Sequence, residues 1–333
     1  MTKERVKPIS KTRKLVNKEL DNDHYIEDYK REFEKELEAE YQKVLKNILS
    51  LIRPFVGLRI TKRQAQQLKR AVEQLIKDYT DKVISKAKEE FPELGEIYWD
   101  SLNEMLSEVE DEFKGQEYSP VSNMFSRQVP LNNKKVGSIE TMLISASALF
   151  LANMESLIDR MNVLEQDTEQ LIGLQYDSAA GRFVKDTKTV SASAIATAIA
   201  LIRESFFKKN NSIVGHIHVS VLDAATTQYC LDRHNQFWRY DKPELSTLPD
   251  STPPGTGHYN CRSTGIPLLR GEVVEELPTY EEWFEELPAS RKEEILGKRR
   301  YELYAKGDIR IQDISDGQGN RLSLDELRQV IRN

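Results

Sequence analysis

Apolar residues recur at helical spacing through the N-terminal third of the chain. Three stripes follow the i, i+3, i+4, i+7 rule of one helix face: Leu45, Ile48, Leu49 and Ile52; Val72, Leu75, Ile76, Tyr79 and Val83; and Ile97, Leu102, Met105, Leu106, Val109 and Phe113. Pro54 ends the first stripe, and Pro92 and Gly95 are expected to break the helix between the second and the third. The pattern predicts three or four long amphipathic helices over residues 20–113.

Further helices are predicted around residues 139–172 and 188–208, where alanine and serine recur between larger apolar residues. Residues 174–184 are expected to form a short hairpin between them. Residues 115–138 are punctuated by two prolines and are predicted to be a connector.

The period changes to two after Gly215. Residues 216–222 alternate apolar and polar side chains and predict a strand, in which His216 and His218 lie together on an exposed face. Residues 237–240 predict a second strand. Residues 243–257 hold four prolines and two glycines and predict a long loop.

Helix signals return near the C-terminus as three capping boxes, formed by Thr279 and Glu282, Ser290 and Glu293, and Ser323 and Glu326. The predicted fold class is α+β: a long N-terminal helical region is followed by a compact C-terminal module with a small antiparallel sheet and capping helices. The expected parts are a flexible basic arm, a helical region, a connector and the module with its helical extension, over residues 1–18, 19–114, 115–138 and 139–333.

Charged residues fall into blocks. The chain of 333 residues has 48 basic and 54 acidic residues and a net charge of −6. Residues 1–18 carry seven basic residues and one acidic residue, which indicates a flexible arm. Residues 19–40 carry ten acidic and three basic residues, residues 41–90 carry twelve basic and five acidic ones, and residues 93–112 carry eight acidic ones and no base. Blocks of this kind on long helices suit docking to a protein partner.

Several protein classes are not expected. The longest uncharged stretches, residues 141–154 and 189–202, have 14 residues each, whereas a membrane-spanning helix needs about 20, so no membrane anchor is predicted. The N-terminus has no apolar signal-peptide core, and two cysteines favour a reducing compartment. The motifs GxxxxGKS/T, GxGxxG and GxSxG are absent, and we expect no enzyme.

Both cysteines and two of the five histidines form two short-spaced pairs, Cys230-x3-His234 and His258-x2-Cys261. Zinc binds thiolate and imidazole in tetrahedral sets that often consist of two such pairs. A structural zinc ion held by Cys230, His234, His258 and Cys261 is therefore one interpretation. The cysteines could also pair without a metal, as buried thiols or a disulfide, or have unrelated roles. A nucleophilic cysteine with His258 as its base is disfavoured, because no oxyanion hole or orienting group is identifiable.

A basic stretch suggests a second kind of site. Arg59, Lys62, Arg63, Lys69 and Arg70 could contact nucleic-acid phosphates along a helix, and such binding would depend strongly on salt. The alternative is a solvated helix face. No aromatic residues are interleaved with them to stack on bases.

Two segments carry a family resemblance. VLDAATTQYC at residues 221–230, followed after the loop by GHYNCR at residues 257–262, resembles the Mu F-like head-morphogenesis family of tailed phages. Its domain typically has a strand ending in Leu-Asp, then a Thr and a Cys, and a closing Pro-x-His-x-x-Cys-Arg-Cys segment, whose last cysteine is replaced here by Ser263. YEEWF at residues 280–284 and LSLDEL at residues 322–327 resemble the tail that many members carry. The matching positions are Asp223, Thr227, Cys230, His258, Cys261, Arg262 and Trp283.

The resemblance implies a structural minor head (capsid) protein of a tailed phage, associated with the portal and involved in head assembly and in genome packaging or ejection. Its partners would be the phage portal protein, the capsid protein and packaged double-stranded DNA. It would be made in the host cytoplasm and lie in the virion, in the head interior or at the portal vertex. The alternatives are a delivered effector enzyme and a zinc-stabilised nucleic-acid-binding protein.

Overall fold

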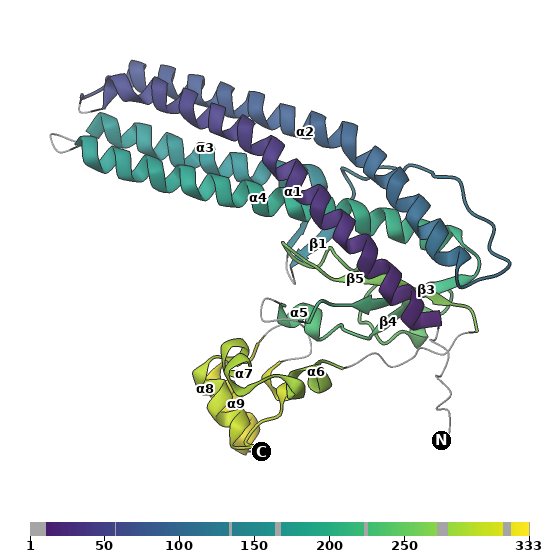
Figure 1. The fold of residues 1–333 in the computed structure, drawn as a ribbon. Helices are drawn as coiled ribbons and strands as arrows, with labels where there is room; N and C mark the ends of the chain where they lie inside the picture. The colour runs from purple at the N-terminus through teal and green to yellow at the C-terminus, as the bar shows by residue number, and fades with distance from the viewer. Residues whose placement is uncertain are drawn as a thin grey trace, which may run out of the picture.

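The computed structural model describes residues 11–56, 58–132, 135–163, 168–222, 226–271, 279–315 and 321–332. The predicted α+β class is confirmed: long helices come first, and a small antiparallel sheet and short helices follow. Figure 1 shows the long helices side by side, the sheet near one end of them and the short C-terminal helices beyond the sheet.

Four long helices form a bundle: α1 (Lys11–Ile52), α2 (Lys62–Ser107), α3 (Ile139–Val163) and α4 (Thr168–Lys209). The turn η1 (Arg53–Phe55) contains Pro54 and ends α1 as predicted. Buried aromatic side chains fill the bundle, and the rings of Phe150 and Phe183 stack with their centroids 4.4 Å apart. The core that these helices share also includes Ile213 and Leu269 of the sheet.

Residues 20–113 form two helices instead of three or four, because α2 continues through Pro92 and Gly95. A proline inside a helix costs about 3 kcal/mol. Its neighbours Phe91 and Leu94 are almost completely buried, and each such side chain contributes about 1.5–3 kcal/mol, which offsets that cost. Gly95 is a packing position, since a Cβ there would lie 2.6 Å from the Tyr118 hydroxyl oxygen and 2.9 Å from Ile202 Cδ1.

Helix α4 is also longer than predicted, and the expected hairpin at residues 174–184 is wrong. Tyr176, Ala179 and Phe183 are buried at helical spacing in this segment. Gly181 faces open space, so it costs the helix only about 1 kcal/mol relative to alanine.

Residues 11–18 of the predicted flexible arm are helical, and residues 1–10 lie outside the described residues. Leu15 is buried in the core. Lys11 and Lys18 form ion pairs with Glu110 and Glu108 at 3.0 and 2.7 Å. This basic segment therefore contacts the acidic block near the end of α2.

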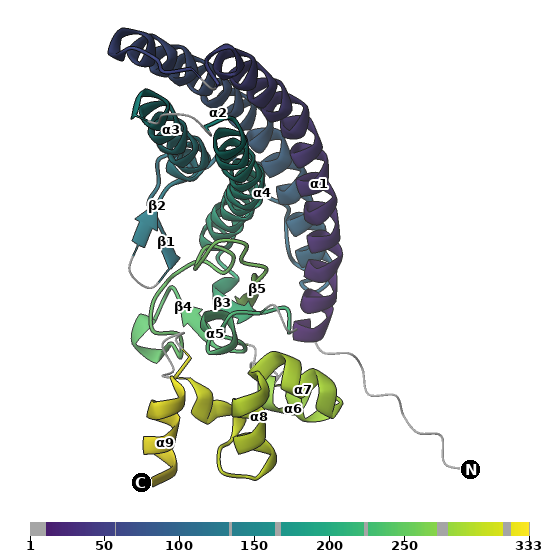
Figure 2. The ribbon, with the colours of Figure 1, turned by 90° about the vertical axis from the view of Figure 1, so that its left-hand side faces the viewer.

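The next two charge blocks pair in the same way along α1 and α2. Lys82 lies 2.6 Å from Glu40, and Lys86 pairs with both Glu36 and Glu90. Opposite charges meet because the two helices run antiparallel, as Figure 2 shows. Part of the charge in these blocks is therefore paired within the molecule, which weakens the argument from charge for docking to a partner.

The sheet consists of β3 (Ile213–Val219) between β4 (Phe237–Arg239) and β5 (Thr264–Leu269), all antiparallel. Strand β3 overlaps the strand predicted at residues 216–222 but begins three residues earlier and ends at Val219, and β4 lies within the predicted residues 237–240. Strand β5 was not predicted, because it contains Pro267, which weakens a strand signal. In the predicted connector, β1 (Val129–Asn132) pairs with β2 (Lys135–Gly137).

The C-terminal helices surround a small core of their own, which includes Phe284 and Leu327. Thr279 and Ser323 form their capping boxes as predicted, but Ser290 lies inside its helix. The remaining short elements are η2 (Pro243–Leu245), α6 (Tyr280–Glu286), α7 (Ala289–Leu296), α8 (Lys298–Ala305), η3 (Ile311–Ile314) and α9 (Leu324–Arg332).

A buried ion pair connects the bundle to the sheet. Glu19 of α1 accepts hydrogen bonds from Arg203 Nη2 at 2.6 Å and from Thr264 Oγ1 at 2.8 Å, and Tyr98 of α2 bonds to both charged groups. Both charged side chains are at most 5% exposed. Since loss of either partner would leave a buried charge without compensation, this network fixes how α1, α2, α4 and β5 pack together.

Two helical segments, Ile139–Met161 and Gly173–Lys209, are long and apolar enough to cross a membrane by length and composition alone. The apolar window of Gly173–Lys209 is 83% buried inside the bundle, and that of Ile139–Met161 is 44% buried. Core helices meet the same criteria, and the absence of a membrane anchor stays a prediction.

Candidate metal centre

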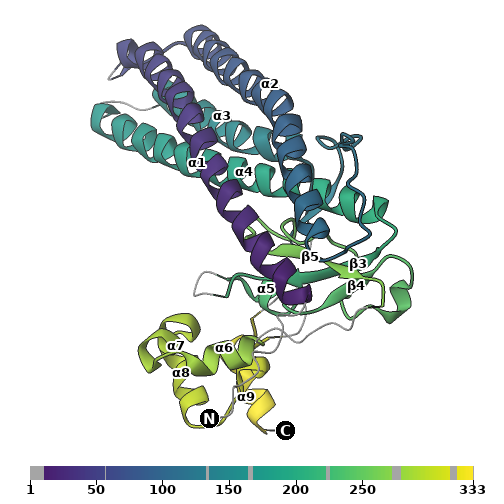
Figure 3. The same cartoon turned by 45° about the vertical axis from the view of Figure 1, so that its right-hand side comes forward.

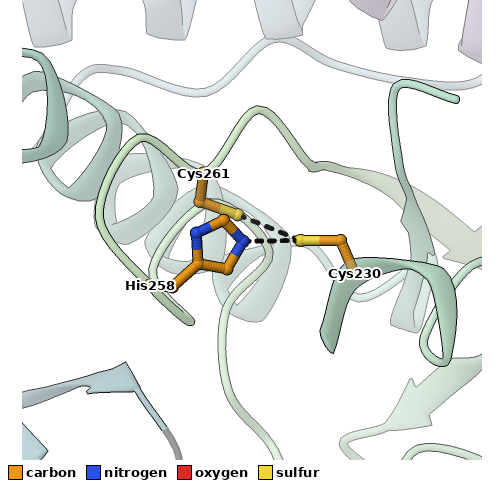
Figure 4. A group of neighbouring side chains, drawn as sticks. All are labelled: Cys230, His258 and Cys261. Carbon is orange, nitrogen blue, oxygen red and sulfur yellow. Dashed lines mark hydrogen bonds between the residues drawn. The ribbon is translucent and has the colours of Figure 1, made fainter. Parts of the chain in front are cut away.

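The predicted zinc ligands lie on two segments beside the sheet. Helix α5 (Gln228–Leu231) begins after Thr227, whose hydroxyl accepts a hydrogen bond from the Cys230 amide at 3.4 Å and so caps the turn. The loop that leads into β5 carries His258 and Cys261. Figure 4 shows the three side chains converging from these two segments.

The sulfur of Cys230 contacts both other residues. It lies 2.9 Å from His258 Nε2 and 3.6 Å from Cys261 Sγ. His258 Nδ1 lies 2.8 Å from the Tyr259 carbonyl oxygen, which orients the ring and leaves Nε2 toward the sulfurs. The three ligand atoms all lie within 4.8 Å of one another, and the group could hold a metal ion.

The three residues of this group have pKa values shifted in different directions. The Cys230 thiol holds the pKa of Cys261 well below its usual value, with His258 acting in the same direction and burial opposing both. Burial alone would lower the pKa of His258, but its contact with Cys261 raises it. The contact with Cys261 and burial raise the pKa of Cys230. Thiolate beside imidazole is the donor set that zinc prefers.

The fourth predicted ligand, His234, is not part of this group. Its Nδ1 accepts a hydrogen bond from the Ser220 backbone amide at 3.1 Å. The described residues that could jointly hold a metal are Cys230, His258 and Cys261. The structure thus brings together three of the four residues in the two Cys–His pairs.

The predicted exposure of His216 and His218 is wrong, because both are only 2% exposed. His216 Nδ1 lies 3.1 Å from the Tyr240 hydroxyl oxygen. Neither ring nitrogen of His218 has a hydrogen-bond partner among the described residues. Burial lowers the pKa of each ring to about 3, so both are neutral at neutral pH. The alternation of side chains predicted that these two share a face, but it could not tell which face is covered.

The cysteines are free thiols. A cavity of about 10 Å³ lies at the group, lined in part by Thr227, Cys230 and His258. A larger cavity of about 390 Å³ lies between α1, α4 and the loop, and Cys261, Arg203 and Lys30 contribute to its lining. The smaller cavity has room for about one water molecule.

Of the remaining positions of the family motif, one contacts the Cys–His group and the others lie elsewhere or outside the described residues. Thr227 Oγ1 lies 2.8 Å from His258 Nε2, so it joins the group. Arg262 is exposed at the rim of both cavities. Trp283 packs against the C-terminal core, and Asp223 lies outside the described residues.

The predicted nucleic-acid-binding residues lie around the end of the bundle where α1 meets α2. Figure 3 shows this end far from the sheet. Lys69 pairs with Asp159 of α3 at 2.7 Å. The other four are exposed, and no ion pair within the described part of the chain involves them: Arg59, Lys62, Arg63 and Arg70.

No family model, no curated protein and no solved structure matches this chain.

Proposed function

We propose that this chain is a structural minor head protein of a tailed phage, associated with the portal, and that a structural zinc ion stabilises its C-terminal module. One observation carries the proposal. Two motif segments that are separated in sequence meet in space, since both Thr227 and Cys230 contact His258, and Cys230 contacts Cys261. This contact is what we expect if the two motifs belong to one module.

Local packing supports a structural role for the metal. The apolar cluster at the site contains only Tyr229, Cys230 and Cys261 among the described residues, and the preceding loop is rich in proline. Structural zinc supplies folding free energy where a hydrophobic core is too small.

Portal association rests on the family resemblance and is tested by capture. The full-length protein and a variant that lacks residues 1–10 are each mixed with the portal subunit. We expect both to be retained, because the deletion leaves α1 (Lys11–Ile52) intact. Retention of neither would contradict the association, and loss of the shorter variant alone would assign the contact to residues 1–10.

Nucleic-acid binding is a second candidate, favoured by the four exposed basic residues at the end of the bundle. Four phosphate contacts predict an affinity loss on the order of 100-fold between 50 and 200 mM salt. Glutamine at Arg59, Lys62, Arg63 and Arg70 should abolish this salt dependence. Lys69→Gln is the matched control, because Lys69 already pairs with Asp159. Salt-independent DNA binding would remove this candidate.

A further inference from the structure

The proposed zinc site has three ligands in place, whereas structural zinc is almost always four-coordinate. The ligand atoms of Cys230, His258 and Cys261 are already close together. His234 is engaged by the backbone of Ser220. The fourth donor must therefore come from another side chain or from water.

His218 is a buried side chain for which the described part of the chain offers no hydrogen-bond partner. It is 2% exposed, and both of its ring nitrogens are without partners among the described residues. An unsatisfied buried polar group is destabilising, and nearly all buried polar groups in folded proteins have a partner in the protein, an ordered water or an ion. Neutral imidazole is also the form that binds metals.

His218 lies in β3, two residues before Ser220, which directly follows the strand. Side chains two residues apart on an extended chain share a face, and Ser220 follows His218 on that face. The Ser220 hydroxyl donates a hydrogen bond to the Cys230 carbonyl oxygen at 2.8 Å and lies 3.1 Å from Ser263 Oγ. Both contacts belong to the segments that carry the metal ligands. Burial has the largest effect on the pKa of His218, and among the neighbouring charged groups Cys261 affects this pKa most.

We propose that His218 is the fourth ligand of the zinc site, which then consists of Cys230, His258, Cys261 and His218. This inference rests on the proposed structural zinc. The ring of His218 stands outside the preassembled group, so it turns about its side-chain bonds toward the sulfurs when the metal binds. Zinc binds thiolate and neutral imidazole, so its binding displaces the protons that these ligands carry.

X-ray absorption at the zinc edge of the full-length, zinc-loaded protein tests the assignment. We expect two sulfur ligands at about 2.3 Å and two imidazole nitrogens at about 2.0–2.1 Å. His218→Ala should leave one imidazole and weaken zinc affinity by more than the roughly 10–100-fold that loss of an outer-shell partner costs. His234→Ala should change neither quantity. His216→Ala controls for the loss of a buried ring on the same strand, because His216 is equally buried.

Two imidazoles in His218→Ala, or one in His234→Ala, would overturn the proposal. If circular dichroism shows that His218→Ala does not fold, the wild-type and His234→Ala spectra still decide: a single imidazole in the wild type rejects His218. A full-length protein that binds no zinc also rejects it. That result would leave the head-protein proposal standing, because the presence of the chain in virions is measured independently of metal.

Discussion

The helical bundle and the Cys–His region are stabilised by different forces. Large apolar side chains are buried along the whole length of α1–α4, in a core that continues into the sheet. Among the described residues, the apolar cluster at α5 consists of Tyr229, Cys230 and Cys261, and short polar contacts to His258 connect its segments. The large core of the bundle compensates for a proline inside a helix, such as Pro92 in α2. The small, loop-rich Cys–His region depends instead on a few directional contacts.

Charge also acts differently in the two regions. On α1 and α2 the charges are mostly exposed and pair across the helix interface, where each pair contributes about 0–1 kcal/mol. In the Cys–His region a few buried groups determine the chemistry. The four predictions below test this contrast, from the largest expected effect to the smallest.

Phe183→Ala should lower the free energy of unfolding by about 3–5 kcal/mol. Phe183 is 1% exposed, stacks on Phe150 and meets the edge of Tyr79. Urea denaturation followed by far-ultraviolet circular dichroism measures the change. Leu174→Ala on the same helix is the control, because Leu174 is 62% exposed and should change stability by less than about 0.5 kcal/mol. Equal effects of the two variants would contradict a tightly packed bundle.

Removing zinc should open the Cys–His region and leave the bundle folded. Zinc at 100 times its dissociation constant stabilises the fold by about 2.7 kcal/mol, and chelation removes this contribution. Hydrogen exchange read by mass spectrometry should show faster exchange over residues 228–261 and unchanged protection in α2 and α4. Loss of protection over the whole chain would contradict the separation of the two regions, and no change anywhere would contradict a structural metal.

Thr227→Ala should cost about 1 kcal/mol, the usual effect of losing a helix N-cap. The same hydroxyl contacts His258, so zinc affinity should fall as well. Thr227→Ser keeps the hydroxyl and should behave like the wild type in thermal denaturation and zinc titration. If the serine and alanine variants behave alike, the hydroxyl has no role.

Asp250→Asn should have the smallest effect. Burial would raise the pKa of Asp250, but hydrogen bonds from Thr252 and the charge of Arg233 lower it below the usual value. Its side chain is 48% exposed, so the ion pair contributes at most about 1 kcal/mol. Because the folded-state pKa is depressed, this contribution is complete above the ordinary aspartate pKa and is lost as pH falls through the folded-state value.

Urea unfolding of both proteins at neutral pH and in acid measures that contribution. The wild type should be slightly more stable at neutral pH, and the difference should vanish below the folded-state pKa. A difference that persists unchanged in acid would show that the carboxylate charge is not its cause.

Periodicity predicted the long helices, β3 and β4, and the short spacing of the Cys–His pairs predicted three of the proposed metal ligands. Proline and glycine predicted false breaks where these local signals conflict with long-range packing. The helix at Gly95 is maintained against Tyr118 and Ile202, which lie far away in the sequence. Residues 174–184 were misread because Gly181 faces solvent, where a glycine costs the helix little.

The site was predicted in part for a related reason. The short spacing between Cys230 and His234 predicted that His234 is a ligand. Spacing along the chain, however, does not determine which side chains lie close together in the fold. His218 lay within a strand that was correctly predicted, but its burial depends on which face the rest of the chain covers. A buried ring without a partner is visible only once the fold is known.

Mass spectrometry of purified virions, before and after genome ejection, tests the central claim most directly. If the chain is a minor head protein, its peptides will be present before ejection at a small fraction of the abundance of the major capsid protein. Their loss after ejection would place the chain among the delivered components, and their retention would place it with the emptied head. Absence of these peptides from virions in which the portal protein is detected would contradict the account.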